Sequence, residues 1–232
     1  MMASRIRFVT LAFCPLCVMC AAGCGTDAGD GAPPAAVAAA APAAPVQTPD
    51  STRPERAAAG PIVLVAYYTE TGMTRRMAVA VAEGARRVAG TNVILASIDS
   101  VRPSDLRSAD AIVLGSPTHW ANMATPMRAF IDSWPGLGLS ARDRIGGAFA
   151  TGGGSGGGKE MVVTSLLLAM LNHGMVVVGP IFEEGGVAYG NFGVAAATGP
   201  ATDQALADTD LESGRALGRR VAEVAAAFRA RD

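Results

Sequence analysis

Cysteine is missing from most of this 232-residue sequence. The only four are Cys14, Cys17, Cys20 and Cys24. The chain after residue 24 therefore has no thiol for a disulfide, a metal site or a nucleophile. Histidine is almost as scarce: His119 and His173 are the only two. No metal-ligand cluster is predicted, and redox chemistry in this part of the chain would need an organic cofactor.

Charge is also scarce and favours neither sign. Charged residues make up 17% of the sequence, with 19 Lys and Arg against 20 Asp and Glu, and the net charge is −1. A nucleic-acid partner is not expected, because it would require a basic surface. A hydrophobic fraction of 50% is ample for a globular core, and the length allows one domain or two.

The N-terminus has the order of features found in a secretory signal. Arg5 and Arg7 precede an apolar segment, 8–22, which is short for a membrane span. Small residues at 21–23 before Cys24 resemble the lipidation site of bacterial lipoproteins, although Ala occupies position 21 where Leu is usual. We predict that residues 1–24 form a signal peptide and that Cys24 is lipidated. Signal peptidase I cleavage and an uncleaved anchor are the alternatives.

Residues 25–60 are dominated by Ala, Pro and small polar residues and have no hydrophobic period. This composition predicts a disordered tether. With a lipid on Cys24, the tether would hold the following domain, 61–232, near a membrane surface. The expected location is the cell envelope, with the cytoplasm as the alternative.

The stretch 62–74 predicts a strand, a turn and the start of a helix. An apolar run with β-branched residues indicates a strand buried on both faces. It ends at Thr69, Thr71, Gly72 and Thr74, whose hydroxyls and backbone, with the N–H groups of the next helix, can cradle a phosphate. An ordinary strand-to-helix loop with a Thr cap is the alternative.

Strands and helices alternate through the rest of the chain. Further strands are predicted at 92–98, 110–116, 145–151 and 175–179, and helices at 74–89, 103–108, 124–133 and 160–172. A last helix has Leu217, Val221, Val224 and Phe228 on its apolar face, and 181–202 is an irregular, Gly-rich excursion. The alternation predicts a doubly wound α/β fold with a five-stranded parallel sheet and helices on both faces.

Loops after the first, third and fourth strands should meet, because ligands bind at the carboxyl ends of strands in such sheets. The loop 116–123 offers Trp120 beside polar groups and could border a planar ring, unless Trp120 packs on the next helix. The loop 151–158 is almost all glycine, so its N–H groups can approach a heterocycle or an anion. A mobile surface loop is the alternative there.

Four motifs together resemble the flavodoxin-like family, and specifically its WrbA-type NAD(P)H:quinone oxidoreductases. They are residues 69–74, 115–123, the glycine loop ending at Lys159 and Glu160, and 172–175. The resemblance covers the chain from about residue 61 to its end. It implies a flavodoxin-like fold, FMN as cofactor, and NAD(P)H and a quinone as partners. It also implies a homo-oligomer.

The resemblance implies roles for individual residues. The FMN phosphate would be held by Thr69, Glu70, Thr71, Gly72, Met73 and Thr74. The isoalloxazine would be bordered by Thr118, His119 and Trp120, with Pro117 and Asn122 as further cofactor contacts. The polar edge of the ring would contact Thr151, Gly152, Gly153, Gly154, Ser155 and Gly156. His173 would face the flavin from the end of its helix as the catalytic residue, although a His there is also a common helix cap.

The sequence departs from the family in three places. The insertion after the second strand is missing, which argues against the tetramer that is usual in the family. The glycine loop is one residue longer. Gly138 stands where relatives carry a Trp over the flavin, so the stacking surface is either absent or replaced by Trp134.

Three functions follow as hypotheses. The first is an FMN enzyme that passes two electrons from NAD(P)H to a quinone. The second is a one-electron carrier, which normally needs an acidic docking face that the charge balance does not provide. The third is an exported, non-catalytic module, either FMN-binding or flavin-empty, that keeps the fold for interaction, because nicotinamide cofactors are scarce outside the cytoplasm.

Overall fold

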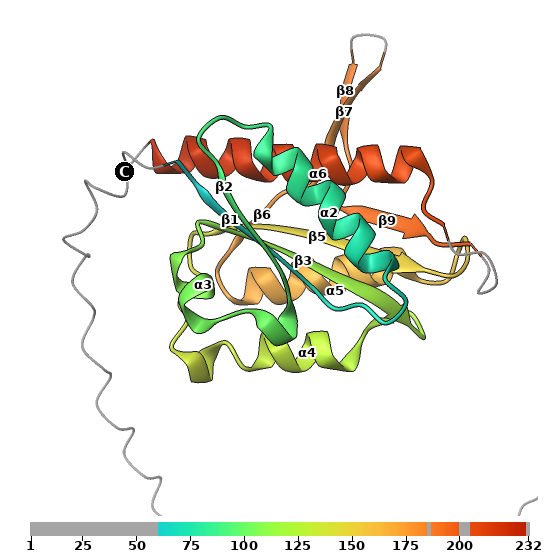
Figure 1. Cartoon of the computed structure of the whole chain (residues 1–232), viewed down its shortest axis with the longest axis horizontal. Coiled ribbons are helices and arrows are strands. Elements are labelled where there is room, and N and C mark those ends of the chain that lie inside the picture. The colour runs from blue at the N-terminus through green and yellow to red at the C-terminus, as the bar shows by residue number, and fades with distance from the viewer. Residues whose placement is uncertain (1–59, 185–186, 200–204, 231–232) are drawn as a thin grey trace, which may run out of the picture. The chain divides into compact units, whose positions relative to one another are not determined.

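A parallel sheet is covered by helices on both faces (Figure 1). The structure is a computed structural model, and it describes residues 60–184, 187–199 and 205–230. The sheet contains β1 (Ile62–Tyr67), β2 (Asn92–Ser97), β3 (Ala111–His119), β5 (Ile145–Gly152) and β6 (Val176–Val177). Their order is β2-β1-β3-β5-β6 and every neighbouring pair is parallel. The predicted doubly wound sheet with five parallel positions is confirmed.

Each face of the sheet has its own hydrophobic core. On one face lie α2 (Met73–Arg86) and α6 (Asp208–Arg229), and on the other lie α3 (Pro103–Ser108), α4 (Thr125–Asp132) and α5 (Lys159–Asn172). Two short 3₁₀ helices, η1 (Ile98–Ser100) and η2 (Pro135–Leu137), complete the helical elements of the described residues.

The central strand β1 shows why the sequence gives this arrangement. Val63 and Val65 belong to the core under α2 and α6, whereas Leu64 and Ala66 belong to the opposite core. All four side chains are fully buried. Alternate residues of a strand point to opposite faces, so only a continuous apolar run can fill both cores.

The fifth position of the sheet differs from the prediction. In place of one strand over 175–179, β6 covers two residues, and β9 (Val194–Ala197) resumes the same position by pairing in parallel with the second half of β5. Between them β7 (Ile181–Glu184) and β8 (Val187–Gly190) form an antiparallel hairpin that projects beyond α6 in Figure 1. The expectation of an irregular segment over 181–202 is therefore wrong for most of its length.

The predicted signal peptide, Cys24 and the tether at 25–60 lie outside the described residues except for Gly60. Among the residues that the structure describes, no helix has both the length and the apolar character required to cross a membrane.

Candidate functional site

Loops after β1, β3 and β5 meet at the carboxyl edge of the sheet, as expected from the sequence. They surround a pocket of about 190 Å³. Its lining residues are Glu70, Thr71, Met73, Thr74, Pro117, Thr118, His119, Thr151, Gly152, Gly153 and Thr198. Ten of these eleven residues were predicted to bind the cofactor, and the sequence reasoning brought them to one place from three separate segments.

The turn between β1 and α2 is shaped to receive an anion. Gly72 caps the helix with φ at 89°, in the left-handed region that glycine adopts most easily. Its N–H donates to Thr69 Oγ1 at 3.0 Å, which fixes the turn. The first helical turn contains no acidic residue, and Arg75 and Arg76 follow Thr74 there. Helix amides without intrahelical partners, with no carboxylate in the first turn, therefore favour a phosphate at this end of the pocket, whereas Arg75 and Arg76 are exposed and outside its lining.

Two residues predicted to bind the cofactor form a hydrogen bond with each other in the lining of the pocket. Thr74 Oγ1 and Thr151 Oγ1 lie 2.8 Å apart, and both residues are buried. This hydrogen bond joins the start of α2 to the end of β5. The two hydroxyls therefore hold the turn between β1 and α2, which we call the phosphate turn, against the sheet. A hydroxyl has one proton and two lone pairs, so whichever threonine donates keeps both lone pairs, and the other keeps one lone pair and its own proton for a ligand.

Thr118 carries an unmet hydrogen-bonding capacity. Its Oγ1 is buried and has no partner within the described part of the chain. The residue is held in place because Ser116, two positions earlier, accepts a hydrogen bond from the Ala124 N–H at 2.9 Å and donates to the Pro117 carbonyl at 2.8 Å. A buried hydroxyl without a partner is costly, and a polar ligand in the pocket would satisfy it.

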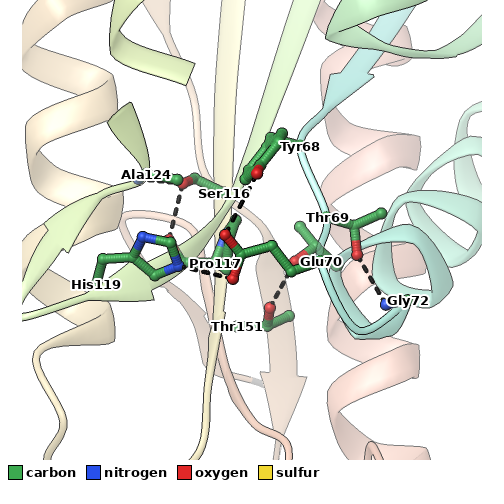
Figure 2. Close-up of polar contacts among 10 residues, drawn as sticks. Tyr68, Thr69, Glu70, Gly72, Ser116, Pro117, His119, Ala124 and Thr151 are labelled. Carbon is green, nitrogen blue, oxygen red and sulfur yellow. Dashed lines mark hydrogen bonds and ion pairs between the residues drawn. The ribbon is translucent and has the colours of Figure 1, made fainter. Parts of the chain in front are cut away.

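Glu70, in the loop after β1, contacts His119 at the end of β3 at the rim of the pocket, as Figure 2 shows. Its carboxylate lies 3.1 Å from His119 Nε2 and accepts a hydrogen bond from the Tyr68 hydroxyl at 3.3 Å. Desolvation raises the pKa of Tyr68, and the neighbouring carboxylate of Glu70 raises it further. The rim thus presents a phenol, a carboxylate and an imidazole in one chain of contacts.

The loop after β3 is a tight hairpin rather than an open loop. β3 turns at Trp120 and Ala121, both left-handed with φ of 51° and 63°, and returns as β4 (Asn122–Met123). Asn122 Nδ2 donates to the Trp120 carbonyl at 3.0 Å. Two consecutive non-glycine residues with positive φ store conformational strain, commonly found at functional sites. Asn122 stabilises this turn and is not among the residues that line the pocket.

Trp120 projects into solvent from the tip of that hairpin. Its side chain is 97% exposed, so the alternative in which it packs on the following helix is wrong. A fully exposed indole beside a pocket is a surface that a flat ring can cover.

The glycine loop is divided between pocket and solvent. Gly152 and Gly153 line the pocket, whereas 154–156 lie beyond its described lining. Gly158 has φ at 83°, and a Cβ there would meet Ala121 Cβ at 2.5 Å, so the loop packs closely on the β3–β4 hairpin. The ammonium of buried Lys159 donates to the Gly154 carbonyl and ties the loop to α5.

His173 does not face the pocket of its own chain, contrary to the prediction. α5 starts at the carboxyl edge of the sheet and runs back along β5 for 14 residues, about 20 Å. His173 therefore follows α5 at the amino edge, where the Asp143 N–H donates to the Gly174 carbonyl at 2.9 Å. Its ring packs on Trp134, with 5.1 Å between the ring centroids.

Trp134 cannot serve as the replacement stacking surface either. It is fully buried and makes an edge contact with Phe130, with ring centroids 5.9 Å apart. Gly138 follows the same helix end, away from the pocket. Within a single chain, Trp134 and Gly138 therefore both lie at the amino edge of the sheet, opposite the pocket.

Two residues of the site were not predicted. Thr198 lines the pocket because β9 brings it beside Gly152, whose carbonyl accepts its N–H at 2.9 Å. Tyr68 joins the rim through Glu70. No local signal marked Thr198, because its position depends on strand pairing after a long excursion. Over the described residues, no group of three or more His, Cys, Asp or Glu is arranged to hold a metal ion.

Comparisons with known proteins agree with this geometry. Residues 103–185 match the family model described as NADPH-dependent FMN reductase. An NAD(P)H dehydrogenase (quinone) from Geotalea uraniireducens (strain Rf4) is 32% identical over 197 residues, covering 71% of this chain and 97% of that protein. A flavodoxin from Aquifex aeolicus (strain VF5) is 37% identical over 167 residues, covering 72% of this chain and 88% of that protein.

Solved structures show the same likeness. The crystal structure described as the flavodoxin, WrbA-like protein from Agrobacterium tumefaciens superposes with a TM-score of 0.55 at 28% identity. The match covers 72% of this chain and 98% of that one.

Proposed function

This chain belongs to the flavodoxin-like family and is an FMN-dependent oxidoreductase, and from this premise we propose that it passes two electrons from NAD(P)H to a quinone. The observation that carries the proposal is the pocket at the carboxyl edge, where the phosphate turn, the unpartnered Thr118 hydroxyl and the glycine loop meet. Relatives named NAD(P)H dehydrogenase (quinone) support this choice of donor and acceptor.

The residues present fit FMN. The N-terminus of α2 would hold the phosphate, and the Thr118 hydroxyl would form a hydrogen bond with the ligand. Gly152 and Gly153 have no side chains, so the edge of a ring could approach their backbone closely. When bound, FMN supplies a ring that takes up two electrons from a nicotinamide and returns them to an acceptor.

Side chains at the site would supply the proton that the reaction consumes. The overall reaction, quinone + NAD(P)H + H⁺ → hydroquinone + NAD(P)⁺, consumes one proton beyond those carried by the donor. His119 and Tyr68 are titratable groups at the rim, and Glu70 holds both in place. We assign these three residues to orienting and protonating the acceptor, while the exposed Trp120 offers it a flat surface.

Stopped-flow absorbance of the FMN-loaded chain tests the proposal. NADH or NADPH should bleach the flavin, and benzoquinone should restore its colour, with ping-pong kinetics in steady state. A flavin that stays oxidised at millimolar NADH and NADPH, yet is reduced by dithionite, would instead support an electron carrier or a non-catalytic module, and the relative named flavodoxin makes that the second candidate.

We further propose that the chain is exported and anchored in the cell envelope by a lipid on Cys24. The support is the order of Arg5 and Arg7, the apolar segment 8–22 and the small residues before Cys24. Cys24→Ser should prevent lipidation and leave the protein unprocessed or released from the membrane fraction. Mass spectrometry that finds an unmodified Met1 in the cytoplasm would refute export.

We also propose that the chain forms a homo-oligomer. α5 exposes three apolar side chains along one stripe, namely Met161, Leu168 and Leu171, each about half exposed or more. Sedimentation velocity should show species larger than the 23.4 kDa monomer, and Leu168→Glu should dissociate them. Monomer at all concentrations would contradict the proposal.

A further inference from the structure

Among the described residues, β9 has a strand partner on one side only. β9 pairs with β5 on one side, and on its other side no further strand of the described residues pairs with it. The segment 191–198 that forms this edge contains neither a charged residue nor proline. Proteins usually protect a free strand edge with charge, proline, a bulge or a covering segment, because unpaired N–H and C=O groups recruit other strands. Ala195 and Ala197 on this edge are only partly buried, so their backbone groups are accessible to an added strand.

The direction of the free backbone groups follows from the pairing with β5. The Thr198 N–H donates to the Gly152 carbonyl at 2.9 Å. In a parallel ladder alternate residues bond to the same neighbour, so Ala196 and Val194 also face β5. The backbone groups of Ala195 and Ala197 consequently point outward, away from the sheet.

Residues 190–195, which include the first part of this edge, line a groove of about 580 Å³. Glu160 and Val163 of α5 form one wall, and Asp210 and Ser213 of α6 form the other. The two helices cover opposite faces of the sheet, so the groove runs along the sheet edge between its two layers. Phe192, 82% exposed, offers an occupant of this groove an apolar contact.

The groove is negatively charged and therefore favours a positively charged occupant. It carries the carboxylates of Glu160 and Asp210, and no residue of the described lining is Lys or Arg. The adjacent cation, Lys159, is buried and bonded to the Gly154 carbonyl. Burial raises the pKa of Asp210, although Lys159 opposes the shift, so this carboxylate is incompletely compensated. A cation in the groove would complete the compensation.

We propose that the groove beside β9 binds an extended, Lys- or Arg-containing segment of a partner protein, which adds to the sheet as a further strand. Backbone hydrogen bonds to Ala195 and Ala197 would supply affinity, and Glu160 and Asp210 would supply the preference for basic side chains. The docked strand would end beside Thr198, which also lines the cofactor pocket. The inference stands on the sheet edge and is independent of the reaction proposed above.

Selection from a random heptapeptide library on the FMN-loaded full chain tests the proposal. Selected peptides should be enriched in Lys or Arg together with β-branched residues, and their affinity is then measured by fluorescence anisotropy. Ala195→Pro removes the outward N–H while the bonds to β5 remain, and it should weaken binding at least tenfold. Ala195→Ser keeps the N–H and is the matched control, with binding expected within twofold.

The charge component has its own variants. Glu160→Gln and Asp210→Asn should each weaken the selected peptides several-fold and reduce the salt dependence of binding. Glu223→Gln, on α6 but outside this groove, should leave binding unchanged. Circular dichroism and flavin absorbance establish that each variant is folded.

A second measurement leaves the protein untouched. N-methylation of alternate amides in a selected peptide should abolish binding in one register and spare it in the other, as strand addition requires. Failure to enrich any peptide, or peptides that bind Ala195→Pro as tightly as the original chain, would overturn the proposal. Self-association that is lost only in Ala195→Pro would identify the occupant as a second copy, which also overturns it.

Discussion

The Thr74 and Thr151 hydroxyls form a buried hydrogen bond of 2.8 Å between residues 77 positions apart in the sequence. Thr74 lies in the first turn of α2, and Thr151 is near the carboxyl end of β5. The bond therefore couples the phosphate turn to the sheet, and the shape of the anion site depends on a contact that has no charge.

The two threonines should not contribute independently to stability. Thr74→Val leaves the Thr151 hydroxyl buried without its partner, so the unfolding free energy of the FMN-free chain should fall by about 1–3 kcal/mol. The double replacement by Val removes both hydroxyls and should cost less than the sum of the single changes. Urea unfolding of the four proteins measures this coupling. Additive single effects would mean that the two hydroxyls do not interact.

Thr118→Val should separate cofactor binding from stability. The buried Oγ1 has no partner within the described residues, so its removal should leave the FMN-free chain as stable as before or more stable. FMN affinity should fall about tenfold, because one ligand hydrogen bond of about 1.4 kcal/mol is lost. Thr118→Ser retains the hydroxyl and is the control. Equal FMN affinity in the Val and Ser variants would show that the hydroxyl does not contact the cofactor.

Two left-handed glycines should respond differently to alanine. Gly72 has φ at 89° and nothing described within 4 Å of an added Cβ, so Gly72→Ala should cost only backbone strain, about 1 kcal/mol. Gly158 has φ at 83°, and its added Cβ would also lie 2.8 Å from Ala121 Cα. Gly158→Ala should therefore destabilise the chain more and displace the Trp120 hairpin. Denaturant midpoints compare the two, and equal losses would contradict the close packing.

The rim network predicts a pH dependence for Tyr68. Desolvation and the Glu70 carboxylate hold the pKa of Tyr68 above its usual value near 10.0. The folded chain should thus keep this phenolic proton to higher pH than the unfolded chain, and this contribution to stability is lost as pH rises above 10. Ultraviolet titration at 295 nm should show late ionisation of Tyr68, shifted back towards 10 in Glu70→Gln. Tyr68→Phe identifies the signal, and an unchanged titration in Glu70→Gln would exclude the coupling.

The strands and their loops were predictable because a strand buried on both faces is recorded in a short, continuous apolar run. The runs that became β1, β3 and β5 are of this kind, and the topology of parallel sheets then placed their following loops at one edge. That argument located Thr74, Thr118 and Thr151 together without knowledge of any distance.

The strand β9 was not predicted and His173 was misplaced, for different physical reasons. β9 is a four-residue stretch of Val and Ala that becomes a strand only by pairing with β5 after a hairpin excursion, and such non-local pairing leaves no local pattern. His173 was placed by resemblance alone. The direction of α5 moves it to the far edge, since a crossover helix that starts at the carboxyl edge ends at the amino edge.

The two tryptophans provide the last prediction, because the structure gives them opposite environments. Trp120 is 97% exposed at the pocket's edge, and Trp134 is fully buried between Phe130 and His173. Trp120→Ala should leave the unfolding free energy within about 0.5 kcal/mol, whereas Trp134→Ala should lower it by about 3–5 kcal/mol.

Fluorescence and kinetics then distinguish their roles. In Trp134→Phe the remaining indole is Trp120, whose emission should be quenched as FMN is titrated in. Trp120→Ala should raise KM for benzoquinone about tenfold for each ~1.4 kcal/mol of stacking lost, and the rate of flavin reduction at saturating donor should change little. If Trp120 emission does not change on addition of FMN, and KM for benzoquinone is unchanged in Trp120→Ala, the acceptor binds away from Trp120. The rim formed by Tyr68, Glu70 and His119 would then be the remaining surface on which a quinone can approach the pocket.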